Sequence, residues 1–267
     1  MTHILFPKLS YAVQGACFDV HNRLRGLNLS EAGWERALLI ALAERGIDSR
    51  NQVQYELAYQ GHPIGHFITD VVVEGKLLLE LKAVEKLLPI HQAQVLSYLR
   101  VTGLELGILV NFGEPRVAFQ RLVLQTARTT SEAVLLPPTD PADLADLLYP
   151  ELTERLRHAL YTVHSTIGPG FMHMHYRRAA QLELPRHEIS YRKHNQITIS
   201  YRGQPIETRE SRLLIVNGLV ALACVAVSVI TPAMRLQMRQ YLNLLDLPLG
   251  LIANFHGRQL EIQTVRV

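Results

Sequence analysis

The chain has 267 residues, 48% of them apolar and 19% charged, the composition of a globular protein with room for two ordinary domains. Its first residues lack a basic start followed by an apolar run, so no signal peptide is expected, and no zinc-finger spacing, glycine-rich phosphate loop or nucleophile elbow occurs. The net charge of +3 is uneven, because residues 1–149 carry 13 Lys and Arg against 16 Asp and Glu, whereas residues 150–267 carry 14 against 8. A basic second half suggests a polyanionic partner.

Helical and strand patterns alternate along the first half of the chain. Apolar residues at helical spacing, such as Trp34, Leu38 and Ala41, indicate helices, and short apolar runs bounded by turn residues indicate strands. We expect helices over 9–24, 31–46 and 89–102, and strands near 52–59, 66–73, 77–84, 106–111 and 117–124. This order predicts an α/β domain with a mixed sheet.

The second half of the chain repeats the first. YQGHPI at 59–64 returns as YRGQPI at 201–206, an offset of 142. At an offset of 143 the matches are Val20-His21 with Val163-His164, Pro89 with Pro232, Gln94 with Gln237, Tyr98-Leu99 with Tyr241-Leu242, Gly107 with Gly250, and Asn111-Phe112 with Asn254-Phe255. We therefore expect two α/β domains of one fold, a first copy at 1–125 and a second copy at 150–267, joined by a proline-containing linker at 126–149 with a short helix.

Two features bear on the environment of the chain. The uncharged stretch 213–230 is close in length to a membrane-spanning helix, but Asn217-Gly218 lies inside it and predicts a hairpin instead. Cys17 and Cys224 match no metal or redox spacing, so both are expected to be buried thiols in a reducing cytosol.

The stretch ITDVVVEGKLLLELKAV, residues 68–84, places charged residues in a predicted apolar hairpin. With a loop at 74–76, the numbers of paired residues sum to 150, so Asp70 faces Glu80, while Glu80 and Lys82 share one strand face. Two facing carboxylates repel each other. Either a divalent cation bound by carboxylate oxygens or a plain ion pair with Lys82 would offset that repulsion.

Helical spacing groups further polar residues. Gln94 and Tyr98 are four apart on one helix face, and Glu31 opens a helix with Glu35 and Trp34 close by. Glu31 alone also fits a solvated first-turn residue favoured by the helix dipole.

Taken together, these residues resemble the PD-(D/E)XK nuclease superfamily, and more narrowly the bacterial GxxExxY family. The resemblance is carried by Val20-His21, by ELKAVE at 80–85, by His91-Gln92-Ala93-Gln94 and by GILVNFG at 107–113. The naming motif departs from the family, because Asn28 replaces its Gly and Trp34 its Tyr, although Glu31 is kept. Thr69 stands where the superfamily name has Pro.

The resemblance implies metal-dependent hydrolysis of a phosphodiester. Asp70 and Glu80 would bind Mg²⁺ or Mn²⁺, and Glu31 would reach the metal directly or through water. Lys82 would orient or help to deprotonate the attacking water and stabilise the charged transition state. The remaining candidates are Gln94 and Tyr98, for positioning Lys82 or a phosphate, and more weakly His91 and Glu85.

The second copy has lost this set of residues. Leu213, Ala223 and Val225 stand at the positions of Asp70, Glu80 and Lys82. The helix motif keeps Gly170 and Tyr176 but has His173 in place of Glu31, and no third ligand is evident that would join His173 and His175 in a metal site. Basic residues of this half would either contact phosphates or form a solvated surface: Arg177, Arg178, Arg192, Lys193, Arg202, Arg209, Arg212, Arg235 and Arg239. The nucleic-acid-binding candidates among them are Arg177, Arg178, Arg209 and Arg212.

The expected function is cleavage of nucleic acid, DNA in preference to RNA, by the first copy of a cytoplasmic protein with no membrane association. The second copy would serve in binding or as the inert half of a pseudo-dimer, and a single centre predicts nicking or single-strand cleavage. Two alternatives stay open, a non-catalytic binding or assembly protein with a vestigial site and a hydrolase of another phosphoester. Homo-oligomerisation is also left open.

Overall fold

The structure is a computed structural model, and it describes residues 5–124 and 148–267. Most of the expected linker and its short helix lie outside the described residues. The described chain forms two compact units, the first with residues 5–57 and 65–124 and the second with residues 58–64 and 148–267. The short segment 58–64, at the turn between two strands of the first copy, thus belongs to the second unit.

The first copy is an α/β fold around a five-stranded mixed sheet, as predicted. The sheet has the order β1-β2-β3-β4-β5, in which β3 and β4 are parallel while β2 with β3 and β4 with β5 are antiparallel. Its elements are α1 (Pro7–Leu24), α2 (Glu31–Ala43), β1 (Ser49–Tyr59), β2 (His62–Val73), β3 (Leu77–Lys82), α3 (Pro89–Thr102), β4 (Leu106–Asn111) and β5 (Ala118–Val123).

The second copy has the same architecture, with a sheet of order β10-β9-β8-β7-β6. Its elements are α5 (Pro150–Ile167), α6 (His173–Glu183), the 3₁₀ turn η1 (Leu184–His187), β6 (Tyr191–Tyr201), β7 (Gln204–Val216), β8 (Val220–Val225), α7 (Pro232–Leu245), β9 (Leu249–Asn254) and β10 (Glu261–Arg266). The pairing of Ala223 with Ile252 reproduces, at an offset of 143, that of Glu80 with Leu109. One extra residue in β7, 13 against 12 in β2, accounts for the change of offset from 142 to 143.

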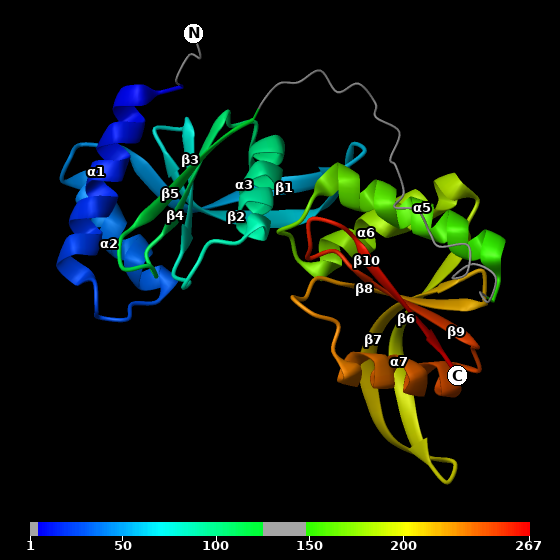
Figure 1. Ribbon diagram of the computed structural model, residues 1–267. Helices are drawn as coiled ribbons and strands as arrows, with labels where there is room; N and C mark the ends of the chain where they lie inside the picture. The colour runs from blue at the N-terminus through cyan, green and yellow to red at the C-terminus, as the bar shows by residue number, and fades with distance from the viewer. Residues whose placement is uncertain (1–4, 125–147) are drawn as a thin grey trace. The chain divides into compact units, whose positions relative to one another are not determined.

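Helices cover both faces of each sheet (Figure 1). In the first copy α1 and α2 bury apolar residues such as Leu38 against Val71, Leu79 and Ile108, while α3 covers the other face. Gly107 makes the close approach of α3 possible, because a Cβ there would lie 2.5 Å from Val95 Cγ1. Gly250 serves α7 in the same way, since its Cβ would lie 2.8 Å from the Met238 side chain.

Within the uncharged stretch 213–230, residues 213–225 form a hairpin of β7 and β8 whose strand residues are largely buried. Asn217 (φ 47°) and Gly218 (φ 71°) both adopt left-handed backbone conformations, which is the chemistry of a tight primed turn. The hairpin prediction is therefore confirmed, and no helix in the described ranges is long and apolar enough to cross a membrane. Cys17 and Cys224 are buried free thiols, as expected.

Candidate active site

The β2–β3 hairpin brings Asp70, Glu80 and Lys82 together. Val73 pairs with Leu77 and Val71 with Leu79, so the predicted register is confirmed and Asp70 and Glu80 are the next residues along it. Asp70 Oδ2 accepts a hydrogen bond of 2.8 Å from the Leu81 N–H. Lys82 Nζ lies 2.7 Å from Glu80 Oε1 on the same strand face.

Helix α2 adds a third carboxylate to this end of the hairpin. Ser30 caps the helix by accepting a bond of 3.3 Å from the Gly33 N–H, which fixes Glu31 as the first helical residue. Glu31 Oε1 accepts a bond of 3.2 Å from the Ala83 N–H, directly after β3. The four residues singled out in the sequence therefore meet at one place.

Burial and mutual repulsion both disfavour ionised carboxylates here. Glu80 is only 2% exposed, and burial followed by the charge of Asp70 raises its pKa to about 7. Burial is also the main cause that raises the pKa of Asp70. Burial alone would lower the pKa of Lys82, but the charges of the surrounding carboxylates outweigh it and raise that pKa.

The donors present fit a hard divalent cation held by two carboxylates. Among the described residues, Glu80 Oε2 is a buried oxygen without a hydrogen-bond partner, which is the state expected of an oxygen reserved for an ion. No group of three or more His, Cys, Asp or Glu side chains in the described ranges is arranged to hold a metal. Asp70 and Glu80 would therefore share the ion with waters or backbone carbonyls, as Mg²⁺ commonly requires.

Comparison with known proteins assigns the fold to a family. A model of the "PD-(D/E)XK nuclease superfamily" matches residues 7–122 and again residues 150–267. The chain belongs to the PD-(D/E)XK nuclease superfamily. No curated protein matches it. A solved structure titled "Crystal structure of SSO0001" shares 17% identity over 59% of this chain and 84% of that one, with a TM-score of 0.25, too low to support any argument.

An asparagine at the end of β4 fastens the loop that follows the superfamily's acidic strand. Asn111 is fully buried; its amide donates to the Val84 carbonyl at 2.8 Å and its oxygen accepts from the Val84 N–H at 3.0 Å. Asn254 makes the same pair of bonds to Val227 in the second copy, at 2.8 and 3.0 Å. The asparagine of the Asn-Phe repeat is therefore a structural fastener, meaning a buried side chain whose hydrogen bonds hold a loop in place. The sequence pattern alone does not reveal this role.

The Val-His repeat is a second fastener. His21 Nε2 lies 3.1 Å from the Glu114 carbonyl and His164 Nε2 lies 2.9 Å from the equivalent Gly257 carbonyl.

Trp34 stacks on Phe112 with ring centroids 4.7 Å apart. In the second copy Tyr176 stacks on Phe255 at 4.5 Å. Trp34 and Tyr176 therefore make equivalent aromatic stacks in the two copies.

The weaker candidates have local structural partners. Gln94 donates to the Tyr98 hydroxyl at 3.0 Å, and Gln237 donates to Tyr241 at the same distance. Because the Gln–Tyr pair persists in the second copy, which lacks counterparts of Asp70, Glu80 and Lys82, it has a structural role in both copies. Its action on Lys82 or a phosphate stays a prediction. His91 Nδ1 accepts from the Leu88 N–H at the start of α3. Glu85 lines a cavity of about 680 Å³ beside Ala83.

In the second copy the corresponding place is basic. His173 begins α6 as Glu31 begins α2, and Arg212 Nη1 lies 2.9 Å from its Nε2. Arg177 and Arg212 line a cavity of about 410 Å³, and Arg177 Nε is buried without a hydrogen-bond partner among the described residues. Burial is the main cause that lowers the pKa of His173, and the positive charges of Arg212 and Arg177 lower it further. Glu210, at 2.6 Å from Arg212, offsets part of this charge.

The four predicted nucleic-acid-binding arginines are not all directed at this cavity. Arg178 Nη1 donates to the Ile64 carbonyl at 2.9 Å. Arg209 is exposed on β7 and makes two bonds of 2.8 Å to Glu207. Of these four arginines, Arg177 and Arg212 line the cavity.

Proposed function

We propose that the first copy is a metal-dependent nuclease site, related more narrowly to the GxxExxY family. The observation that carries the proposal is the meeting of Asp70, Glu80, Glu31 and Lys82 around a buried carboxylate oxygen of Glu80 that lacks a partner. Superfamily membership supplies the reaction class, hydrolysis of a phosphodiester.

Each of these side chains has a distinct task in the proposed site. Asp70 and Glu80 would hold Mg²⁺ or Mn²⁺, and Glu31 would reach the ion directly or through water. When bound, the ion would lower the pKa of the attacking water and offset charge on the phosphoryl oxygens. Lys82 has a raised pKa, so it keeps its proton at neutral pH and acts by orienting the water and stabilising negative charge on the phosphate.

The second copy binds the nucleic-acid backbone. Two guanidinium groups, Arg177 and Arg212, occupy the region where the first copy gathers carboxylates, so the phosphate ligand needs no metal there. Arg178 and Arg209 add positive charge outside the cavity. With one hydrolytic centre for two copies, the protein cuts one strand of DNA per encounter, and DNA is the preferred substrate over RNA.

A second candidate function is nucleic-acid binding without hydrolysis. The basic cavity of the second copy favours it, because that cavity is complete without any residue of the acidic set. In this alternative the first site is vestigial.

Cleavage of end-labelled oligonucleotides distinguishes the two functions. The substrates are single- and double-stranded DNA and RNA, each with Mg²⁺, Mn²⁺ or EDTA. The nuclease proposal expects ion-dependent products from wild-type protein and from Lys76→Ala, an exposed lysine in the same hairpin, but not from Lys82→Ala. Tight binding with no ion-dependent product on any substrate would favour the binding function instead.

A further inference from the structure

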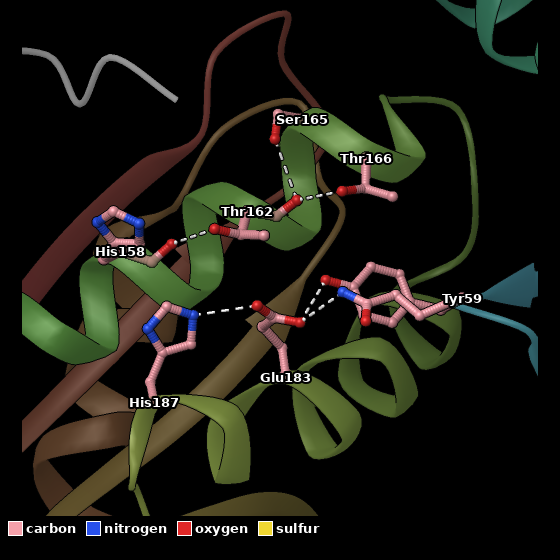
Figure 2. A network of polar contacts seen from close by, with 8 residues as sticks. Tyr59, His158, Thr162, Ser165, Thr166, Glu183 and His187 are labelled. Atoms are coloured by element: carbon pink, nitrogen blue, oxygen red, sulfur yellow. Dashed lines mark hydrogen bonds and ion pairs between the residues drawn. The ribbon is translucent and has the colours of Figure 1, made fainter. Parts of the chain in front are cut away.

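The turn of the β1–β2 hairpin, residues 59–64, is called the first tip. Its end residues Tyr59 and Ile64 are buried within the second unit, where Tyr59 lies beside Glu183 (Figure 2). Tyr59 is 0% exposed, and its hydroxyl donates to Glu183 Oε2 at 2.8 Å. The Gln60 amide donates to the same oxygen at 3.0 Å. At the end of the tip, Arg178 donates to the carbonyl of Ile64, which is 1% exposed.

The surface that receives the first tip is made by the last turns of α5 and α6. Glu183 is the last residue of α6, and the hydroxyl of Thr166, in the last turn of α5, also interacts with Tyr59. His187 Nε2 lies 3.0 Å from the other carboxylate oxygen of Glu183, which holds the receiving carboxylate in place. The contact therefore combines aromatic burial with hydrogen bonds to a charged acceptor.

The second copy presents an equivalent turn without such a cover. Residues 201–206, the second tip, form the turn of the long β6–β7 hairpin (Figure 1), and the strand residues next to this turn are exposed. Tyr201 is 63% exposed and Ile206 65% exposed. The backbone is the same, with φ of 49° and 80° at Arg202 and Gly203 against 49° and 81° at Gln60 and Gly61. The second tip thus has the backbone shape of the first, but its Tyr and Ile are exposed where those of the first tip are buried.

The first copy in turn contains the groove that corresponds to the receiving surface. A cavity of about 210 Å³ lies between the last turns of α1 and α2. Its lining includes Arg23 at the position of Thr166 and Ala41 at the position of Glu183. Ile40, beside Ala41, is 63% exposed and adds apolar surface at the rim. This cavity is the α1–α2 groove.

The charges of the second tip and of the α1–α2 groove are complementary. Arg202 replaces Gln60 in the second tip, so the tip carries a positive charge beside the tyrosine ring, 5.4 Å from its centroid. The α1–α2 groove lacks the carboxylate of Glu183 but is lined by Asp19 and Glu44. Arg23 and Arg45 both pair with Asp19, at 2.8 and 3.4 Å, which leaves Glu44 as the acceptor best suited to Arg202.

We propose that the occupant of the α1–α2 groove is a second copy of this chain, which inserts its second tip there. The contact repeats between molecules the contact that the first tip makes with α5 and α6. Tyr201 fills the apolar space over Ala41, and Arg202 pairs with Glu44. Because tip and groove lie on different copies of the repeat, two chains related by a two-fold axis can each supply one of each and close a dimer. This inference goes beyond the nuclease function and does not depend on it.

Sedimentation velocity on the full chain tests the assembly. Wild-type protein is expected at twice the chain mass of 30.2 kDa or more, and Tyr201→Ala is expected to raise the dissociation constant at least about tenfold. Leu236→Ala, at a residue 55% exposed on α7, is the matched control and leaves the assembly unchanged. A wild-type chain that stays monomeric at high concentration overturns the proposal. So does a Tyr201→Ala variant that assembles as wild type but loses oligonucleotide binding, because the second tip would then be a nucleic-acid contact.

Disulfide trapping tests which surfaces meet. Arg202→Cys and Ile40→Cys are prepared separately, mixed and oxidised, so that a cross-link can form only between molecules. Both native cysteines are buried, and burial raises their pKa to about 12, so they stay unreactive. A cross-linked dimer is expected from this mixture and not from Ile40→Cys mixed with Arg235→Cys, whose cysteine lies on α7. Equal yields from the two mixtures contradict the proposed contact.

Discussion

The two copies share a fold and its fasteners but differ at the residues that would do chemistry. Asn111 and Asn254 make the same bonds, and His21 and His164 contact equivalent carbonyls. At the positions of Asp70 and Glu80, the second copy instead has Leu213 and Ala223, one of them 2% exposed and the other half-buried. The fold therefore does not need the carboxylates.

This difference indicates what the carboxylates of the first copy are for. A buried carboxylate without a full set of partners destabilises a folded protein, and replacement by an apolar residue is commonly neutral or stabilising. The second copy shows that the replacement is structurally acceptable. Retention of Asp70, Glu80 and Lys82 in the first copy is thus best explained by a function that requires them.

The largest expected effect is on hydrolysis by the first copy. Asp70→Asn removes a charge from the proposed ion site while keeping the side-chain shape, and we expect the cleavage rate to fall at least about 1,000-fold. Glu74→Gln, which removes an exposed carboxylate from the same hairpin, serves as the control and keeps the wild-type rate. Equal loss in both variants, measured on labelled DNA, would remove the distinction between the two carboxylates.

Loss of the fasteners should affect both copies alike. Asn111→Ala removes the side-chain partner of the N–H and C=O groups of half-buried Val84, and Asn254→Ala does the same to half-buried Val227. Each is expected to lower the free energy of unfolding by about 3 kcal/mol, measured by urea denaturation of the copy concerned. A variant whose free energy of unfolding equals that of the wild type would show that its asparagine does not stabilise the fold.

Mg²⁺ should stabilise the first copy alone. At a concentration 100 times the dissociation constant, the gain in unfolding free energy is about 2.7 kcal/mol, seen as a higher melting temperature that Asp70→Asn abolishes.

The pKa of Glu80 rises on folding from 4.5 to about 7, so the stability of the ion-free protein falls as the pH rises through that interval. Because the ion requires the ionised carboxylate, the Mg²⁺ effect should be larger at pH 8 than at pH 5. A gain of equal size in Asp70→Asn would place the ion elsewhere.

The basic cavity of the second copy should contribute to binding and not to the chemical step. Arg177→Gln and Arg212→Gln are each expected to weaken oligonucleotide binding several-fold and to reduce the slope of log K against log salt by about 1. Arg235→Gln on α7 provides a charge-matched control. Fluorescence anisotropy at several salt concentrations gives both quantities, and an unchanged slope in both cavity variants would exclude phosphate contacts there.

The smallest expected effect compares the two tips. Tyr59→Phe removes a buried hydroxyl that bonds to Glu183, and should cost about 1 kcal/mol of unfolding free energy. Tyr201→Phe alters an exposed side chain and should cost nothing measurable at protein concentrations low enough to keep the chain monomeric. Thermal or urea unfolding of the two variants side by side gives the comparison.

Local sequence patterns were sufficient to predict the hairpin and the acidic residues that meet on it. The register around residues 74–76 follows from loop length, and strand alternation then places Glu80 and Lys82 on one face. The role of Asn111 could not be predicted, because it depends on the distance between β4 and the loop after β3. The burial of Tyr59 could not be predicted either, since Tyr59 and Tyr201 occupy nearly identical sequence contexts but differ in what packs against them.

The most direct test of the difference between the copies is anomalous diffraction from a crystal of the full chain soaked in Mn²⁺. The account predicts one strong peak within about 2.5 Å of carboxylate oxygens of Asp70 and Glu80, with no peak beside Leu213 and Ala223. A saturating soak with no peak at Asp70 and Glu80 would contradict it.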